Sequence, residues 1–143
     1  MLLIVHAALT WVLVGLILTI QVVHYPLFAR VGTAGYAAYQ RDHVTRITGL
    51  VAPLMLAELG TGAALVLRPP PGVPAASTGL GLALIISVWL STALVQSPAH
   101  GQLAAGFDPA WHARLVRTNW WRTLAWVARG GLVGWWLLLT TTT

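Results

Sequence analysis

Four long apolar segments account for most of this chain, and they constrain its fold more than any other feature. They cover about residues 3–25, 47–67, 79–97 and 119–139. A helix needs about 20 mostly apolar residues to cross about 30 Å of hydrocarbon, so each segment has the length of a membrane span. Only 8% of the 143 residues are charged, against about 25% in soluble domains. The sequence therefore predicts an all-α integral membrane protein, a four-transmembrane-helix bundle forming a single membrane domain over residues 1–143.

The composition excludes several classes of function. The eight basic residues are all arginines and are scattered between apolar runs, so the lipid bilayer is the expected partner and nucleic acid is not. The absence of cysteine excludes disulfides, thiolate metal sites and c-type haem. The chain also has no phosphate-binding lysine loop, no nucleophile elbow and no His-Glu-x-x-His zinc helix.

The arginines predict an orientation. Positive residues concentrate in the cytoplasmic connections of membrane proteins. The first and third connections, with the helix starts that follow them, hold six arginines, whereas the second connection holds only Arg68. We therefore expect a multi-pass protein of the bacterial inner membrane, with both of these connections in the cytoplasm and both termini on the periplasmic side. The six residues are Arg30, Arg41, Arg46, Arg114, Arg117 and Arg122.

The two long connections are expected to contain short amphipathic helices. In the first, Tyr36, Tyr39 and His43 recur at steps of three and four residues. In the second, Asp108 and Pro109 are a typical N-cap and first helical residue.

The two halves of the chain also resemble each other. A shift of 76 positions aligns His24 with His100 and Arg46 with Arg122. Two spans per half would make this a 2+2 parallel internal repeat, related by an axis along the membrane normal.

Four histidines fall at one predicted membrane face, and they are the candidate metal ligands. In a four-helix bundle the helix ends at one face lie within reach of one another. Two imidazoles from facing helices suit haem b, with His24 and His100 as the preferred pair, whereas three or four suit copper, iron or zinc. A single histidine at a helix end near the lipid headgroups, however, is often simply hydrated. The four are His24, His43, His100 and His112.

Polar residues inside the spans extend this candidate site. A glutamine near a histidine can orient its imidazole or join two helices. Arginines there can anchor propionates, quinone oxygens or an anionic substrate. The fourth segment carries a polar stripe at helical spacing that cannot face lipid. The expected cofactor-binding residues are Gln21, Gln96, Arg46, Arg122, Asn119 and Trp126.

Glu58 and Arg129 are predicted to pair. Each lies about 15–16 Å along its helix from the same membrane face, because a helix rises 1.5 Å per residue. An isolated charge at that depth costs at least about 2.5–3.5 kcal/mol. The pair either fixes two helices together or has a catalytic or proton-handling role, and the sequence leaves both interpretations open.

These features favour a protein that binds haem or a His-ligated metal for redox chemistry on a membrane-soluble, quinone-like substrate. The first alternative is a proton-coupled transporter or channel that uses Glu58 and Arg129, for which the small size favours a homodimer. The second is an accessory subunit of a larger membrane complex.

Overall fold

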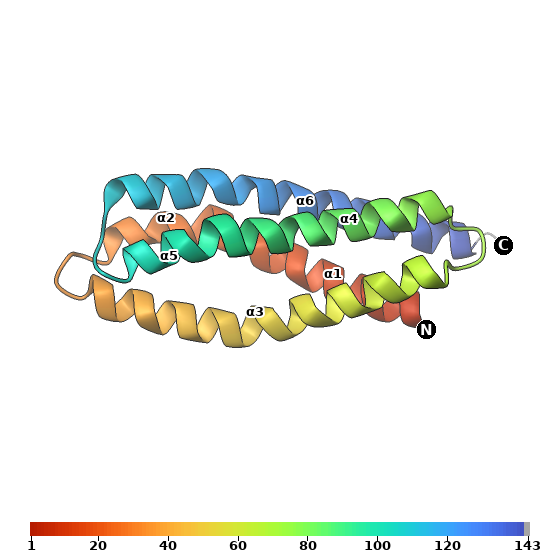
Figure 1. The fold of residues 1–143 in the computed structure, drawn as a ribbon, viewed down its shortest axis with the longest axis horizontal. Coiled ribbons are helices and arrows are strands. Elements are labelled where there is room, and N and C mark those ends of the chain that lie inside the picture. The colour runs from red at the N-terminus through yellow and green to blue at the C-terminus, as the bar shows by residue number, and fades with distance from the viewer. Residues whose placement is uncertain (142–143) are drawn as a thin grey trace.

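The computed structural model describes residues 1–141, and within that range its regular structure is entirely helical. The elements join end to end into four long rods that lie side by side (Figure 1). The helical elements, in chain order, are α1 (Leu2–Thr19), the π-helical turn η1 (Ile20–His24), α2 (Tyr25–Leu27), the 3-10 turn η2 (Phe28–Arg30), α3 (Tyr36–Leu67), α4 (Ala75–Ser91), the π-helical turn η3 (Thr92–Gln96), α5 (Ser97–Leu103) and α6 (Pro109–Thr141).

The rods form a bundle with alternating directions. Helix α1 packs against α3 and α6, and α4 packs against the same two helices. Three rods, Leu2–Arg30, Tyr36–Leu67 and Ala75–Leu103, are long and apolar enough to cross a membrane. Helix α6 is long as well but is not in that group, and it carries four arginines. The fold is therefore compatible with a helical membrane protein.

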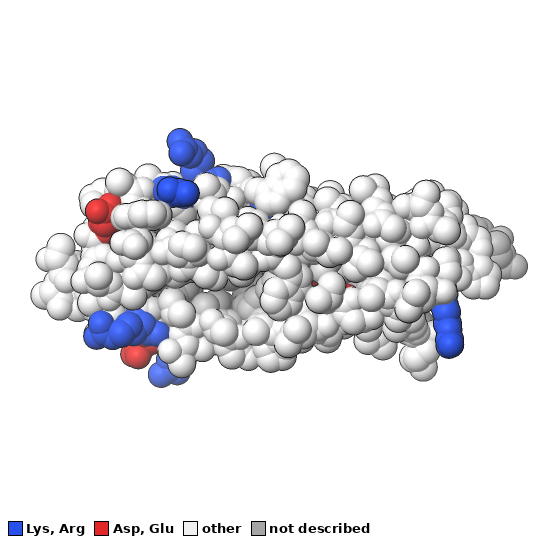
Figure 2. All heavy atoms as spheres, viewed as in Figure 1, with Lys and Arg blue, Asp and Glu red and all other residues white. Residues whose placement is uncertain are grey.

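Charged side chains gather near one end of the molecule (Figure 2). The middle of the visible surface is almost entirely uncharged, whereas basic groups cluster at the end where α3 and α6 begin, and one basic group marks the opposite end. This distribution agrees with the asymmetry of the arginines along the chain.

Two prolines that look like span terminators lie inside continuous rods. Pro26 and Pro98 each follow a π-helical turn, η1 and η3 respectively. A proline cannot donate a hydrogen bond and clashes with the carbonyl four residues earlier. A π-turn widens the helix over those residues and so relieves the clash. The first and third rods therefore continue to Arg30 and Leu103, beyond the predicted ends of the spans.

The predicted amphipathic helices are not separate elements. Residues 36–46 form the start of α3, and residues 109–118 form the start of α6. Nothing between Gly35 and Pro53 interrupts the helix, so it propagates directly into the span. The remaining connections at this end are residues 31–35 and 104–108, and His43 and His112 consequently lie within long helices.

The element boundaries show a two-part architecture with a different offset from the predicted one. Helices α1 and α3 begin at residues 2 and 36, and α4 and α6 begin at residues 75 and 109, each 73 positions later. The connections 31–35 and 104–108 follow the same offset. At this offset His24 corresponds to Ser97, so its predicted alignment with His100 does not follow the structural repeat.

Candidate functional site

Three of the predicted histidines come together where η1, α3 and α5 meet. His24 Nε2 lies 2.9 Å from His43 Nδ1 in a hydrogen bond. The ring centroids of His24 and His43 are 4.8 Å apart, and those of His43 and His100 are 5.4 Å apart. Phe28 packs edge-on against His43 at 5.0 Å. The three imidazoles thus form a continuous group, with His43 between the other two.

The fourth histidine is held differently. His112 Nε2 donates to the backbone oxygen of Tyr25 at 2.8 Å. This contact joins the start of α6 to the turn after η1. His112 is near the group but uses one ring nitrogen to connect helices.

His100 is bound on both sides by side chains that sequence reasoning did not single out. Its Nδ1 lies 2.7 Å from Gln40 Nε2, and its Nε2 lies 3.0 Å from the hydroxyl of Tyr25. Gln40 is fully buried, and its amide oxygen accepts from Tyr36 at 3.4 Å. The spacing of Tyr36, Tyr39 and His43 by three and four residues indicated this face of α3. It did not show which residue on that face contacts a histidine.

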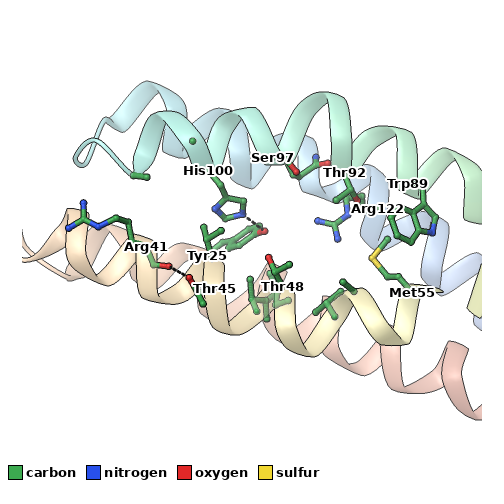
Figure 3. A pocket seen from close by; sticks show the side chains of 18 residues that line it. Tyr25, Arg41, Thr45, Thr48, Met55, Trp89, Thr92, Ser97, His100 and Arg122 are labelled. Carbon is green, nitrogen blue, oxygen red and sulfur yellow. Dashed lines mark hydrogen bonds between the residues drawn. The ribbon is translucent and has the colours of Figure 1, made fainter. Parts of the chain in front are cut away.

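Tyr25, His100 and Arg122 line a cavity of about 600 Å³. The cavity lies between α3 on one side and α4, η3 and α5 on the other, and Figure 3 shows Arg122 and Tyr25 pointing into it from behind. Its walls are mainly apolar, with Met55 and Trp89 at one end. This combination of a large apolar space and a few convergent polar groups is typical of a small-molecule site.

Arg122 enters this cavity from α6 as a buried cation. It is 7% exposed, its Nη1 donates to Asn119 Oδ1 at 3.1 Å, and its guanidinium lies 5.2 Å from the Trp126 ring centroid. Tyr25 lies within electrostatic reach of it. No carboxylate pairs with Arg122 in the described part of the chain, since the single Arg–carboxylate ion pair there belongs to Arg129 and Glu58.

Two residues that line this cavity each carry a buried polar atom with no hydrogen-bond partner within residues 1–141. These atoms are Arg122 Nε and the indole Nε1 of Trp89. Buried polar groups are almost always paired, so each exception calls for an explanation. Both atoms carry hydrogens, so both could donate to a ligand that offers acceptor atoms.

Gln21 and Gln96, the two glutamines predicted to orient imidazoles, instead connect helices. Neither contacts a histidine among the described residues. Gln21 accepts from Asn119 Nδ2 at 2.7 Å and donates to the backbone of Val116. Gln96 accepts from Ser91 at 2.9 Å and donates to Thr118 at 3.4 Å. The predicted role of orienting an imidazole is therefore taken by Gln40, which contacts His100. The widened turns η1 and η3 change the helical phase, so residues three or four apart there contact different helices.

Glu58 and Arg129 form the predicted ion pair, with Arg129 Nε 3.1 Å from Glu58 Oε1. Both side chains are completely buried. Glu58 also accepts from Thr10 at 3.0 Å and from Trp126 Nε1 at 3.1 Å, and Arg129 also donates to the backbone of Gly81. Each member is surrounded by protein partners, which favours the structural interpretation of the pair.

His6, near the start of α1, belongs to this second network. Arg129 Nη2 donates to His6 Nε2 at 2.8 Å. Because arginine can only donate, His6 Nδ1 carries the hydrogen and donates to Thr61 at 2.7 Å. The network therefore joins α1, α3, α4 and α6 at a level of the bundle remote from the histidine group.

Arg46 does not approach Arg122. It is exposed and lines a smaller depression beside His24 and His43. Within residues 1–141 no set of three histidine, aspartate or glutamate side chains is arranged to hold a metal ion. One physical reason is that His24 and His43 each use a ring nitrogen to bind the other.

Comparisons with protein-family models, with curated proteins and with solved structures give no match for this chain.

Proposed function

We propose that this protein is a four-span membrane protein that binds a hydrophobic small molecule in the cavity between α3 and α4–α5, and that Arg122 holds an oxygen of that molecule. The cavity volume of about 600 Å³ falls in the range of about 300–1,000 Å³ usual for such sites. A quinone-like substrate of the bilayer is the class we favour. The arginine-rich end would face the cytoplasm of a bacterial cell, as the positive-inside rule predicts.

The observation that carries this proposal is the buried, uncompensated charge of Arg122. Removing a guanidinium from water costs several kcal/mol unless an anion or a set of acceptors replaces the lost hydration. Arg129 has Glu58 for this purpose, whereas Arg122 has one amide oxygen, an aromatic face and a phenol among the described residues. A ligand oxygen would supply the missing acceptor.

The neighbouring groups suit a ligand whose oxygen takes part in chemistry. Tyr25 and His100 are hydrogen-bonded to each other at 3.0 Å beside Arg122. A phenol backed by an imidazole can move a proton to or from a bound oxygen, and a nearby guanidinium stabilises negative charge that develops there. These groups suit a reaction in which a carbonyl oxygen gains a proton or a hydroxyl group loses one.

The proposal can be tested with 1,4-naphthoquinone as the probe and the fluorescence of Trp89 and the other tryptophans as the signal. We expect saturable quenching in the detergent-solubilised protein and about tenfold or greater weakening in Arg122→Met. The matched control is Arg117→Met, on an exposed face of the same helix, which should bind normally. Quenching that never saturates, or that is identical in Arg122→Met, would refute the proposal.

A second candidate is a transition-metal site at the histidines, favoured by the three adjacent imidazoles and by His43 Nε2, which is buried without a partner in the described residues. Zinc, copper or iron would suit these ligands, provided that the His24–His43 hydrogen bond opens. Haem b between His24 and His100 fits less well, because the His43 ring lies between them.

Metal analysis and an absorbance spectrum of the purified protein test whether the histidines hold a transition metal. Stoichiometric metal that is lost in His43→Ala would support it, and a Soret band would identify haem. A colourless, metal-free protein that does not take up added zinc or copper would eliminate it.

A further inference from the structure

We propose that the cavity selects ligands whose inner oxygen is an unprotonated acceptor, such as a carbonyl, and that Gln40 is the positioning residue that sets this preference. The inference deepens the proposed function and depends on it. The observation behind it is the chain of hydrogen bonds from Gln40 through His100 to Tyr25.

The direction of this chain follows from its first member. Gln40 Oε1 accepts from the Tyr36 hydroxyl at 3.4 Å, which orients Nε2 of the amide toward His100 Nδ1 at 2.7 Å. An amide nitrogen can only donate, so Nδ1 of His100 is the acceptor. In a neutral imidazole the hydrogen must then be on the other nitrogen, Nε2.

The tautomer of His100 fixes the role of Tyr25. His100 Nε2–H donates to the Tyr25 hydroxyl oxygen at 3.0 Å, so the hydroxyl hydrogen of Tyr25 is not used in this contact. No other protein acceptor for it is present in residues 1–141. Tyr25 is 3% exposed and lines the cavity, and its hydrogen is therefore available to a ligand there.

The polar end of the cavity consequently offers donors. The hydroxyl hydrogen of Tyr25 and the Arg122 Nε–H both lack a protein acceptor in the described range. A carbonyl or oxyanion satisfies such a set, whereas the hydrogen of an alcohol or phenol meets no acceptor among them. Sites built to pair with a ligand group discriminate well against a ligand that leaves buried groups unpaired.

The experiment compares two competitors of the same shape, the bicyclic ketone 1-tetralone and its alcohol 1-tetralol, against the naphthoquinone probe. In the wild-type protein we expect the ketone to bind about tenfold more tightly, which corresponds to one good hydrogen bond. Gln40→Glu is nearly isosteric, but its carboxylate would accept from His100 Nδ1. His100 Nε2 would then accept the Tyr25 hydrogen, and the ligand would lose that donor.

In Gln40→Glu we therefore expect ketone affinity to fall about five- to tenfold while alcohol affinity is retained or improved, so that the preference disappears. A merely structural role for Gln40 would weaken both competitors equally. The matched control is Gln102→Glu, an exposed position on α5, which should keep the preference. Tyr25→Phe removes this donor while Arg122 remains, and it should reduce the ketone preference even if Gln40→Glu does not fold.

The outcomes separate this inference from the proposed function. If neither competitor displaces the probe and Arg122→Met binds it normally, the proposed site is wrong. If both competitors bind equally to the wild-type protein, or if Tyr25→Phe keeps the ketone preference undiminished, the site stands and the inference about ligand class is overturned.

Discussion

The guanidinium of Arg129 and the carboxylate of Glu58 meet at 3.1 Å across 71 positions of sequence, with both side chains fully buried. They join α3 to α6, and hydrogen bonds from Thr10 and to His6 add α1 to the same network. The pair is thus a junction between distant parts of the chain rather than a local contact.

Removing one member of this pair should destabilise the bundle strongly. Glu58→Gln leaves Arg129 buried without a counter-charge, for which we expect a loss of about 3–5 kcal/mol. Thermal unfolding in detergent measures the loss. The double variant Glu58→Leu, Arg129→Met should be less damaged than Glu58→Gln, because it leaves no unpaired charge. A double variant that is worse than the single one would show that the charges themselves stabilise the fold.

The two buried arginines of α6 should differ in how much stability is lost on the same substitution. Arg129→Met leaves Glu58 uncompensated and should cost about 3–5 kcal/mol. Arg122→Met removes a cation that has no carboxylate partner among the described residues, so stability should stay within about 1 kcal/mol of wild type while probe binding is lost. Equal destabilisation by both substitutions would mean that Arg122 is a structural residue.

Gly81 should not tolerate a side chain. A Cβ there would lie 2.8 Å from Trp136 Cη2 and 3.3 Å from Arg129 Nη1. We expect Gly81→Ala to cost about 1–3 kcal/mol through overpacking. Gly79, on the same helix, has open space around its Cβ position, and Gly79→Ala should be neutral or stabilising by up to about 1 kcal/mol. Thermal unfolding of the two variants makes the comparison, and a stabilising Gly81→Ala would contradict the packing described above.

Asp108 should stabilise the start of α6. Its Oδ1 accepts from the backbone N–H groups of Ala110 at 2.8 Å and Trp111 at 3.0 Å, as in an N-cap. Asp108→Ala is expected to cost about 1 kcal/mol. Asp42→Ala removes an exposed acid within a helix and should change stability by no more than about 0.5 kcal/mol. Indistinguishable unfolding midpoints for the two variants would argue against the cap.

Hydropathy and helical spacing predicted the helical architecture and the buried pair well. The apolar segments appear as long helices, and equal depth along two helices was enough to pair Glu58 with Arg129. Both results depend on lengths and periods that the sequence displays directly. The convergence of His24, His43 and His100 also followed from their common position near one end of the bundle.

The contacts within the site depend on which way each residue faces around its helix axis. That direction cannot be read from the sequence where a π-helical turn intervenes. Pro26 and Pro98 read as helix ends, but the π-turns before them let each rod continue and rotate the residues beyond it. For this reason Gln21 and Gln96 contact α6 and its neighbours, and the role of holding an imidazole passes to Gln40. The proline two positions after His24 and after Gln96 is the signal that identifies such turns.

The common 73-residue offset of the helix pairs bears on ancestry. Two copies of a single α-helical hairpin, packed side by side in the same orientation, would generate this arrangement. In the present chain, however, the first hairpin contributes Glu58 and the second contributes Arg129. A symmetric dimer of either half alone would bury two like charges, so this ion pair requires one copy of each hairpin.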